Sequence, residues 1–153
     1  MLYLVRHAKA GSRRDWEGPD HGRPLSKTGR RQAEGLVDLL VDGSVTSILS
    51  SPYVRCVETV QPLAEKLALT VDHAPALAEG ASPIDAVRLL RGLAGTTAVL
   101  CSHGDVIPAI LDALVESDDL PLPPDYPYPK GSTWVLEDRD GRWARAHYLP
   151  PPP

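Results

Sequence analysis

Two side chains that could act together on an anion, Arg6 and His7, directly follow an apolar run, LYLV, near the start of the sequence. The run is apolar at every position, which is typical of a short strand buried on both faces in the middle of a sheet. Such a strand leaves Arg6 and His7 at its carboxyl edge, where α/β proteins bind ligands. Because a guanidinium can hold phosphoryl oxygens and an imidazole can attack phosphorus, the pair suggests phosphate chemistry.

Two more predicted strands also end in polar residues. Residues 45–49 precede a turn and a helix whose first turn carries Arg55, and residues 96–101 form an apolar strand followed by His103. In a doubly wound sheet these side chains share one edge with His7, where helix N-termini also favour anions. We therefore expect two arginines and two histidines to surround a dianion, of which phosphate is the obvious example.

The elements alternate in the order β-α-β-α-(β)-α-β-α and finish with a hairpin around Asp140-Gly141. This order predicts an α/β fold, a three-layer sandwich with a mostly parallel central sheet, helices on both faces and an antiparallel C-terminal edge hairpin. Helices are expected to start at Ser26, Pro52, Pro83 and Asp105.

Several finer features are predicted along the chain. Pro62 should kink or split the second helix, and Ile84, Val87, Leu90 and Leu93 should form the buried stripe of the third. Residues 12–24 are rich in Gly, Pro and charge and predict a long loop that serves as a flap or substrate rim. Residues 1–149 are expected to form a single domain, and 150–153 a disordered proline tail.

Composition narrows the class of protein. The 153 residues are 42% hydrophobic and 24% charged with a net charge of −4, which fits a globular chain and argues against a nucleic-acid partner. Cys56 and Cys101 fall in apolar segments and predict buried thiols, as in a reducing cytoplasm. Without an apolar run of membrane-spanning length, a cytoplasmic protein with no membrane contact is expected.

Four blocks in this order resemble the histidine phosphatase superfamily, which also contains the phosphoglycerate mutases. The blocks are Val5-Arg6-His7, the stretch PLSKTGRRQA at 24–33, the stretch SPYVRCVET at 51–59, and Ser102-His103-Gly104. The resemblance implies that His7 is the nucleophile that becomes phosphohistidine. It also implies that Arg6, Arg55 and His103 hold the phosphoryl oxygens.

The resemblance further implies a carboxylic acid that protonates the leaving oxygen. Glu79 is our candidate, and Asp105 is the rival. Lys9, Ser12 and Gly104 are expected to add further contacts to the phosphoryl group. Neither a metal nor another cofactor is implied.

The sequence departs from the common Arg-His-Gly-Glu of the family, because Ala8 and Lys9 follow His7. The form Arg-His-Ala resembles the small SixA-like subgroup, which is associated with phosphohistidine on proteins. It also resembles the histidine phosphatase domain fused to some Nudix hydrolases that act on nucleotides. The leading hypothesis is thus a phosphatase of protein phosphohistidine, with nucleotides or other small phosphoesters and phosphoanhydrides as the alternative.

Three other interpretations use the same residues. Cys101, His103 and Asp105 alternate and could bind a metal with His7, although they lack a paired ligand motif. A non-catalytic phosphate-binding module would need the same pocket without turnover. A mutase would have to protect its phosphoenzyme from water, which the short chain does not favour. The sequence gives no indication of the oligomeric state.

Overall fold

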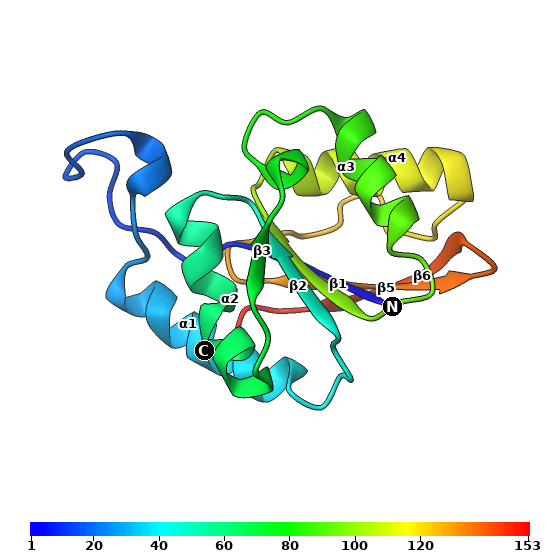
Figure 1. The fold of residues 1–153 in the computed structure, drawn as a ribbon. Helices are drawn as coiled ribbons and strands as arrows, with labels where there is room; N and C mark the ends of the chain where they lie inside the picture. The colour runs from blue at the N-terminus through cyan, green and yellow to red at the C-terminus, as the bar shows by residue number, and fades with distance from the viewer.

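The computed structural model describes residues 1–153 as a six-stranded mixed sheet flanked by helices (Figure 1). The strands are β1 (Leu2–Arg6), β2 (Ser47–Ser50), β3 (Val71–His73), β4 (Ala98–Ser102), β5 (Thr133–Arg139) and β6 (Arg142–Leu149). Their order across the sheet is β3-β2-β4-β1-β5-β6, and β3, β2, β4 and β1 are parallel. Strand β5 runs antiparallel to β1 and pairs with β6 as the edge hairpin. The predicted fold class is confirmed.

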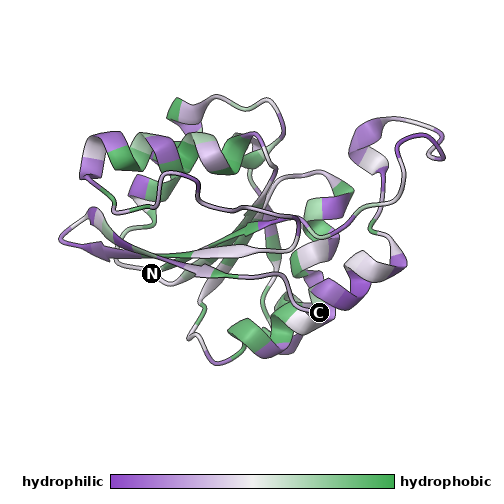
Figure 2. Cartoon of the chain, turned by 180° about the vertical axis from the view of Figure 1, so that it is seen from behind, coloured by the Kyte–Doolittle hydropathy of each residue, from purple (hydrophilic) through white to green (hydrophobic).

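Helices cover both faces of this sheet (Figure 1). They are α1 (Lys27–Leu40), α2 (Val54–Leu67), α3 (Pro83–Gly92) and α4 (Val106–Asp118), with two short 3₁₀ turns at Asp20–Gly22 and Pro75–Leu77. Alternate residues of β1 separate the two cores, because Leu2 and Leu4 pack with α3 and α4 while Tyr3 and Val5 pack with α1 and α2. The central strands are accordingly hydrophobic (Figure 2). No helix combines the length and the apolar character needed to cross a membrane.

Local signals place two of the element ends where the sequence predicts them. The Ser26 hydroxyl accepts the backbone N–H of Gly29 at 3.1 Å and so caps α1. Asp140 and Gly141 have φ angles of 53° and 79°, the left-handed conformation of a type I′ turn between β5 and β6. Asp105 precedes α4 as expected, but its side chain makes no capping hydrogen bond.

Two predictions about helices are wrong in part. Pro62 does not split the second helix, because Val60 and Leu63 on either side of it are fully buried against the sheet and their packing holds α2 together as one element. In α3 Ala86 and Leu90 are buried, and Val87 and Leu93 pack partly buried against the same core. Of the predicted stripe only Ile84, which is 70% exposed, lies elsewhere. Residues 86 and 90 are four apart and define the inward face, which leaves position 84 on the opposite side.

The proline tail also differs from the expected disordered end. Strand β6 ends at Leu149, and Pro152 is buried. A Cβ atom added to Gly35 of α1 would collide with the Pro152 ring, so the tail packs closely on this helix. The absent side chain at Gly35 provides the space for it.

The loop between β1 and α1 protrudes from the body of the protein (Figure 1). Its two ends are joined by an antiparallel bridge between Ala10 and Leu25 and by the N–H of Gly11, which donates to the Pro24 carbonyl at 3.0 Å. The Arg23 guanidinium also donates to the Gly11 carbonyl at 2.7 Å. The two ends of the loop are therefore held together by hydrogen bonds, and the residues between them project outward.

Gly29 offers a test of how the chain that follows His7 is anchored. An added Cβ at this position would overlap the carbonyl of Lys9, whose oxygen also accepts the N–H of Ser26 at 2.9 Å. We predict that Gly29→Ala lowers the free energy of unfolding by about 1–3 kcal/mol in urea denaturation, because backbone rather than a side chain must move. Gly92→Ala is the matched control, since nothing lies within 4 Å of its added Cβ. Equal stability of the two variants would contradict this account.

Candidate active site

The carboxyl ends of β1, β2 and β4 bring together the polar residues predicted from the sequence. The N–H of His7 donates to the Ser102 carbonyl at 3.0 Å, and the N–H of Ser51 donates to the Cys101 carbonyl at 2.9 Å. A cavity of about 500 Å³ opens at this edge. The predicted residues that line it are Arg6, His7, Ser12, Arg55, Glu79, Gly104 and Asp105.

His7 is buried, with one ring nitrogen held by the backbone. Its Nδ1 lies 2.8 Å from the carbonyl oxygen of Ala8, which can only accept, so the hydrogen bond assigns the proton to Nδ1 and leaves a lone pair on Nε2. Burial lowers the pKa of His7 to about 3, and the nearby His103, Arg55 and Arg6 act in the same direction. The imidazole is therefore neutral near pH 7, which is the form that can act as a nucleophile.

Thr59 fixes the peptide next to this ring. Its hydroxyl accepts the N–H of Ala8 at 2.9 Å and donates to the Arg55 carbonyl at 2.7 Å. The last residue of the 51–59 block thus connects the segment that carries His7 to the helix that carries Arg55.

His103 lies beside His7, with their ring centroids 5.4 Å apart. Its Nε2 is 2.8 Å from the hydroxyl of Ser51, which also accepts the N–H of Tyr53. The Ser51 hydroxyl can donate to Nε2 or accept from it, and the tautomer in which it donates has the proton of His103 on Nδ1. That Nδ1 is buried and has no partner in the chain. His103 can therefore donate a hydrogen bond to an anion next to His7.

Arg6 is held against the turn that begins α4. Its Nη1 donates to the Tyr128 carbonyl at 3.0 Å, and its Nε is buried without a partner. A Cβ added to Gly104 would come within 2.6 Å of the Arg6 Nη2 and 2.7 Å of its Cζ. Gly104 is thus needed for the guanidinium to lie where it does.

Arg55 is 1% exposed, and its guanidinium packs over the Tyr53 ring at 4.9 Å from the ring centre. Its Nη1 donates to the Asp20 backbone carbonyl at 3.0 Å, and its Nη2 donates to the Asp20 carboxylate at 3.1 Å. Its Nε is buried and unpartnered. Arg55 is therefore fixed by Asp20 and Tyr53, while its Nε remains available as a donor.

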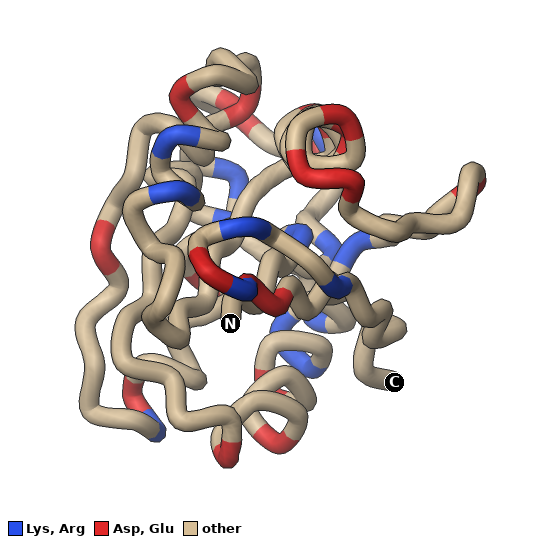
Figure 3. The backbone as a smooth tube through the Cα atoms, turned by 90° about the vertical axis from the view of Figure 1, so that its right-hand side faces the viewer, with Lys and Arg blue, Asp and Glu red and all other residues tan.

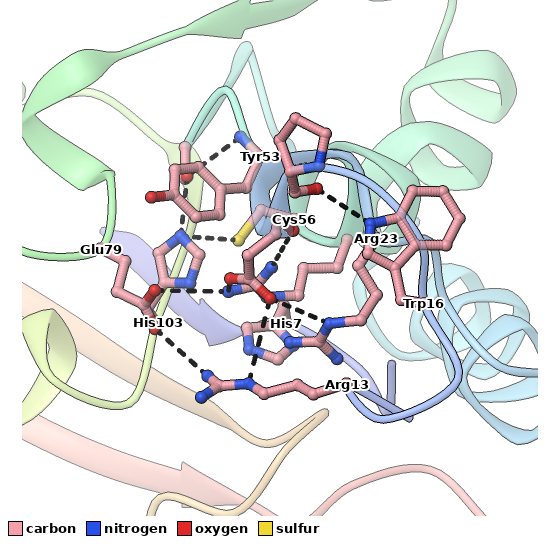
Figure 4. A network of polar contacts seen from close by, with 12 residues as sticks. His7, Arg13, Trp16, Arg23, Tyr53, Cys56, Glu79 and His103 are labelled. Atoms are coloured by element: carbon pink, nitrogen blue, oxygen red, sulfur yellow. Dashed lines mark hydrogen bonds and ion pairs between the residues drawn. The ribbon is translucent and has the colours of Figure 1, made fainter. Parts of the chain in front are cut away.

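The two candidate acids differ in their contacts. The Asp105 carboxylate accepts the backbone N–H of Gly80 at 2.8 Å and so anchors the segment that carries Glu79. Glu79 makes no hydrogen bond, and its oxygens lie 3.6 Å from Nη2 of Arg55 and 3.8 Å from Nη2 of Arg13 (Figure 4). The geometry favours Glu79 as the group free to reach a ligand.

Two of the predicted site residues, His103 and Lys9, do not line the cavity, and His103 is instead buried beside it. Lys9 is exposed. Its backbone N–H donates to the Gln32 side chain at 3.0 Å and its carbonyl accepts from Ser26, so the chain has already turned towards α1 at this position.

Other residues reach the site without a clear signal in the sequence. Arg23 and Lys130 line the cavity, and Asp20 contacts Arg55 from the 3₁₀ turn of the loop. The i,i+3 spacing of Asp20 and Arg23 is the one local hint, since it places opposite charges together in a turn. Cys101, His103 and Asp105 do not form a metal site, because no group of three or more His, Cys, Asp or Glu side chains is suitably arranged.

Comparison with known proteins identifies relatives of this chain. The family model of the histidine phosphatase superfamily (branch 1) matches residues 2–82. The 8-oxo-(d)GTP phosphatase of Mycolicibacterium smegmatis is 39% identical over 156 residues, which cover 99% of this chain and 48% of that protein. An uncharacterized protein of Mycobacterium tuberculosis is 33% identical over 96 residues, or 60% of this chain and 46% of that protein. The chain thus spans about half the length of these curated relatives.

Solved structures share the fold over nearly the whole chain. A protein from Agrobacterium tumefaciens assigned as the phosphohistidine phosphatase SixA superposes with a TM-score of 0.75 at 27% identity, covering 98% of this chain and 97% of that one. A protein from Nakamurella multipartitia with the same assignment gives a TM-score of 0.76 at 22% identity, with 98% and 95% covered. The second likeness concerns the fold alone.

Gly104 provides a test of the position of Arg6. We predict that Gly104→Ala weakens orthophosphate binding, measured by calorimetry, by about tenfold to a hundredfold, because the new Cβ displaces the Arg6 guanidinium, which we expect to contact the anion. The unfolding free energy should change little, since the displaced group is the end of a flexible side chain. Gly92→Ala, on the outer part of α3, is the control, and equal phosphate affinity in both variants would contradict the assigned role of Gly104.

The lowered pKa of His7 predicts a pH dependence of stability. Between its ordinary value of about 6.5 and its folded value of about 3, the unfolded chain binds a proton that the folded protein does not, so stability falls as the pH falls through this window. On lowering the pH from 7 to 5 the wild type should lose about 2 kcal/mol more than His7→Gln does. Urea denaturation of both proteins at the two pH values measures this difference. Parallel losses would mean that His7 is not held neutral by the fold.

Proposed function

The chain belongs to the histidine phosphatase superfamily, and on that premise we propose that it is a phosphatase that works through a phosphohistidine intermediate on His7. The observation that carries this proposal is a set of buried donors without partners, namely Nε of Arg6, Nε of Arg55 and Nδ1 of His103. Buried polar atoms in folded proteins normally have partners. Three such donors around one neutral imidazole support a site that a phosphoryl group completes.

The first step transfers the phosphoryl group to His7. The Nε2 lone pair forms a bond to phosphorus while the bond from phosphorus to the leaving group breaks, and the electron pair of that bond departs with the leaving group. In such transfers charge spreads over the three equatorial oxygens of phosphorus. Arg6, Arg55 and His103 supply donors to these oxygens, and the Ala8 carbonyl stabilises the proton on Nδ1 as His7 gains positive charge.

The second step returns His7 to its free form. A water molecule attacks the phosphorus, the bond between phosphorus and nitrogen breaks, and orthophosphate leaves. The two steps together consume one water molecule for each phosphoryl group released. A carboxylate that gave a proton to the leaving group in the first step can take one from this water in the second.

We assign that carboxylate to Glu79. It lines the cavity and is not committed to any hydrogen bond, whereas one oxygen of Asp105 holds the N–H of Gly80. Asp105 is then a positioning residue for the Glu79 segment.

Two substrate classes follow from the relatives. Phosphohistidine on a protein is supported by the SixA assignment of the 27% identical structure. A nucleotide is supported by the 39% identity to an 8-oxo-(d)GTP phosphatase, which extends over 99% of this chain. In both cases the reacting group is a terminal phosphoryl group placed on His7.

Phosphate release tests the function. Wild type and His7→Ala would be assayed in the presence of EDTA with a phosphohistidine protein, a nucleoside di- or triphosphate and p-nitrophenyl phosphate. Release by the wild type alone, with acid-labile phosphate trapped on the protein, is the expected result, and the preferred substrate decides the class. Tight phosphate binding with no release from any substrate would overturn the proposal and indicate a non-catalytic phosphate-binding module.

The role of Glu79 gives a separate prediction. Glu79→Gln should lower kcat for phenyl phosphate by about 10²-fold or more, since general acid catalysis is typically worth that much. The effect on p-nitrophenyl phosphate should be much smaller, because its leaving group is stable without a proton. Asp105→Asn should reduce both rates by a similar, smaller factor. If instead Asp105→Asn shows the strong dependence on the leaving group, Asp105 is the acid.

A further inference from the structure

Asp20 lies among three arginine side chains, of which Arg13 and Arg23 are labelled in Figure 4. One carboxylate oxygen is 3.1 Å from Nη2 of Arg55, and the other is 3.1 Å from Nε of Arg23 and 3.9 Å from Nε of Arg13. Burial acts to raise the pKa of Asp20, but the hydrogen bond from Arg23 and the charge of Arg55 outweigh it and lower the pKa. Three guanidinium groups thus converge on one anion.

Two of these three cations, Arg55 and Arg23, are fixed more firmly than this anion, whereas the Arg13 side chain is 72% exposed. The side chains of Arg55 and Arg23 are 1% and 7% exposed, whereas that of Asp20 is 42% exposed. Arg55 packs on Tyr53, and Arg23 is held by the Gly11 carbonyl at the base of the loop. Because these guanidinium groups have supports of their own, they keep their places when a different anion replaces Asp20.

The cavity carries more positive charge than a single phosphoryl group requires. Lysine and arginine mix with acidic residues over most of the chain (Figure 3), but five cations and only two carboxylates line this cavity. The cations are Arg6, Arg13, Arg23, Arg55 and Lys130. Burial lowers the pKa of Lys130, and the charges of Arg6, Arg23 and Arg13 add to this effect, so the cations are close enough to repel one another. A dianion at His7 would leave this excess only partly neutralised.

We propose that Arg13, Arg23 and Lys130 form a second phosphate subsite next to His7, so that the substrate class is a phosphoanhydride with two consecutive phosphoryl groups. The terminal group lies over His7 with Arg6, Arg55 and His103, and the second group takes the place that the Asp20 carboxylate holds in the free protein. This inference rests on the proposed function and names the substrate of the same site. Nucleoside diphosphates and triphosphates belong to this class.

The subsite also suits the chemistry of an anhydride. Nε2 of His7 bonds to the terminal phosphorus, the bond from that phosphorus to the bridging oxygen breaks, and this oxygen leaves on the second phosphoryl group with an added negative charge. Arg13, Arg23 and Lys130 would stabilise this charge as it develops. Water then releases the first group as orthophosphate. The imidazole leaving group of a phosphohistidine carries no anionic oxygen to place in the subsite.

The test is the ratio of kcat/KM for a nucleoside diphosphate to kcat/KM for p-nitrophenyl phosphate. In the double variant Arg13→Ala/Lys130→Ala this ratio should fall about tenfold or more, since hydrogen bonds to charged groups are worth that much. Arg14→Ala/Lys27→Ala removes the same charge from two exposed positions that do not line the cavity, and it should leave the ratio unchanged. Equal ratios in the two double variants would overturn the subsite.

A binding measurement separates this result from a failure of the proposed function. Calorimetry with His7→Ala needs no turnover, and inorganic pyrophosphate should bind at least about tenfold more tightly than orthophosphate. The advantage should be lost when Arg13→Ala/Lys130→Ala is added. Phosphate and pyrophosphate binding with equal affinity would overturn the subsite even if phosphatase activity is established, whereas an inactive wild type that retains the advantage would overturn only the proposed catalysis.

Asp20→Asn tests whether its carboxylate holds the place of the second phosphoryl group. The variant removes the charge and retains the shape, so pyrophosphate affinity should rise several-fold while orthophosphate affinity changes less. If Asp20 instead served to orient Arg55, the variant would bind both anions more weakly. That outcome would overturn the replacement of Asp20 by substrate.

Discussion

The parallel pairing of β1 with β4 is the constraint on which the site depends. It places the N–H of His7 on the Ser102 carbonyl and thereby sets two imidazoles side by side at one edge of the sheet. The pairing of β4 with β2 extends this edge to Ser51, and α2, which starts soon afterwards, delivers Arg55. The register of three short buried strands therefore aligns residues that are about 50 positions apart along the chain.

The backbone and the side chains make different electrostatic contributions to the site. The backbone settles the protonation of His7, because an accepting carbonyl fixes its tautomer and burial keeps the ring neutral. Side chains then concentrate positive charge around that neutral ring, and such a concentration needs internal anions to be tolerated. Asp20 and Glu79 supply them, each within 4 Å of two or more arginines. The free protein is thus organised around an anion before any ligand binds.

The sequence predicted the parts of this arrangement that follow from periodicity. Apolar runs and turn residues are local signals. They were enough to deduce the mixed α/β sheet, the hairpin at Asp140, and the meeting of His7, Arg55 and His103 at one edge of the sheet. The roles of Arg23 and Lys130 could not, because they come from irregular segments whose path is decided by tertiary contacts. The same reason explains why Lys9 does not line the cavity, since hydrogen bonds to α1 turn the chain away from it. The contributions of these residues to catalysis stay predictions.

Because the base of the loop between β1 and α1 is fixed, the loop can change without disturbing the fold. Its ends are joined by the bridge between Ala10 and Leu25 and by the hydrogen bond from Arg23, so the residues between them can change in length without moving the strand or the helix. Doubling the length of such a loop costs only about 0.6 kcal/mol in closure entropy. A change in this loop could therefore accommodate a new leaving group while the contacts of His7 with Ala8 and Ser102 stay the same.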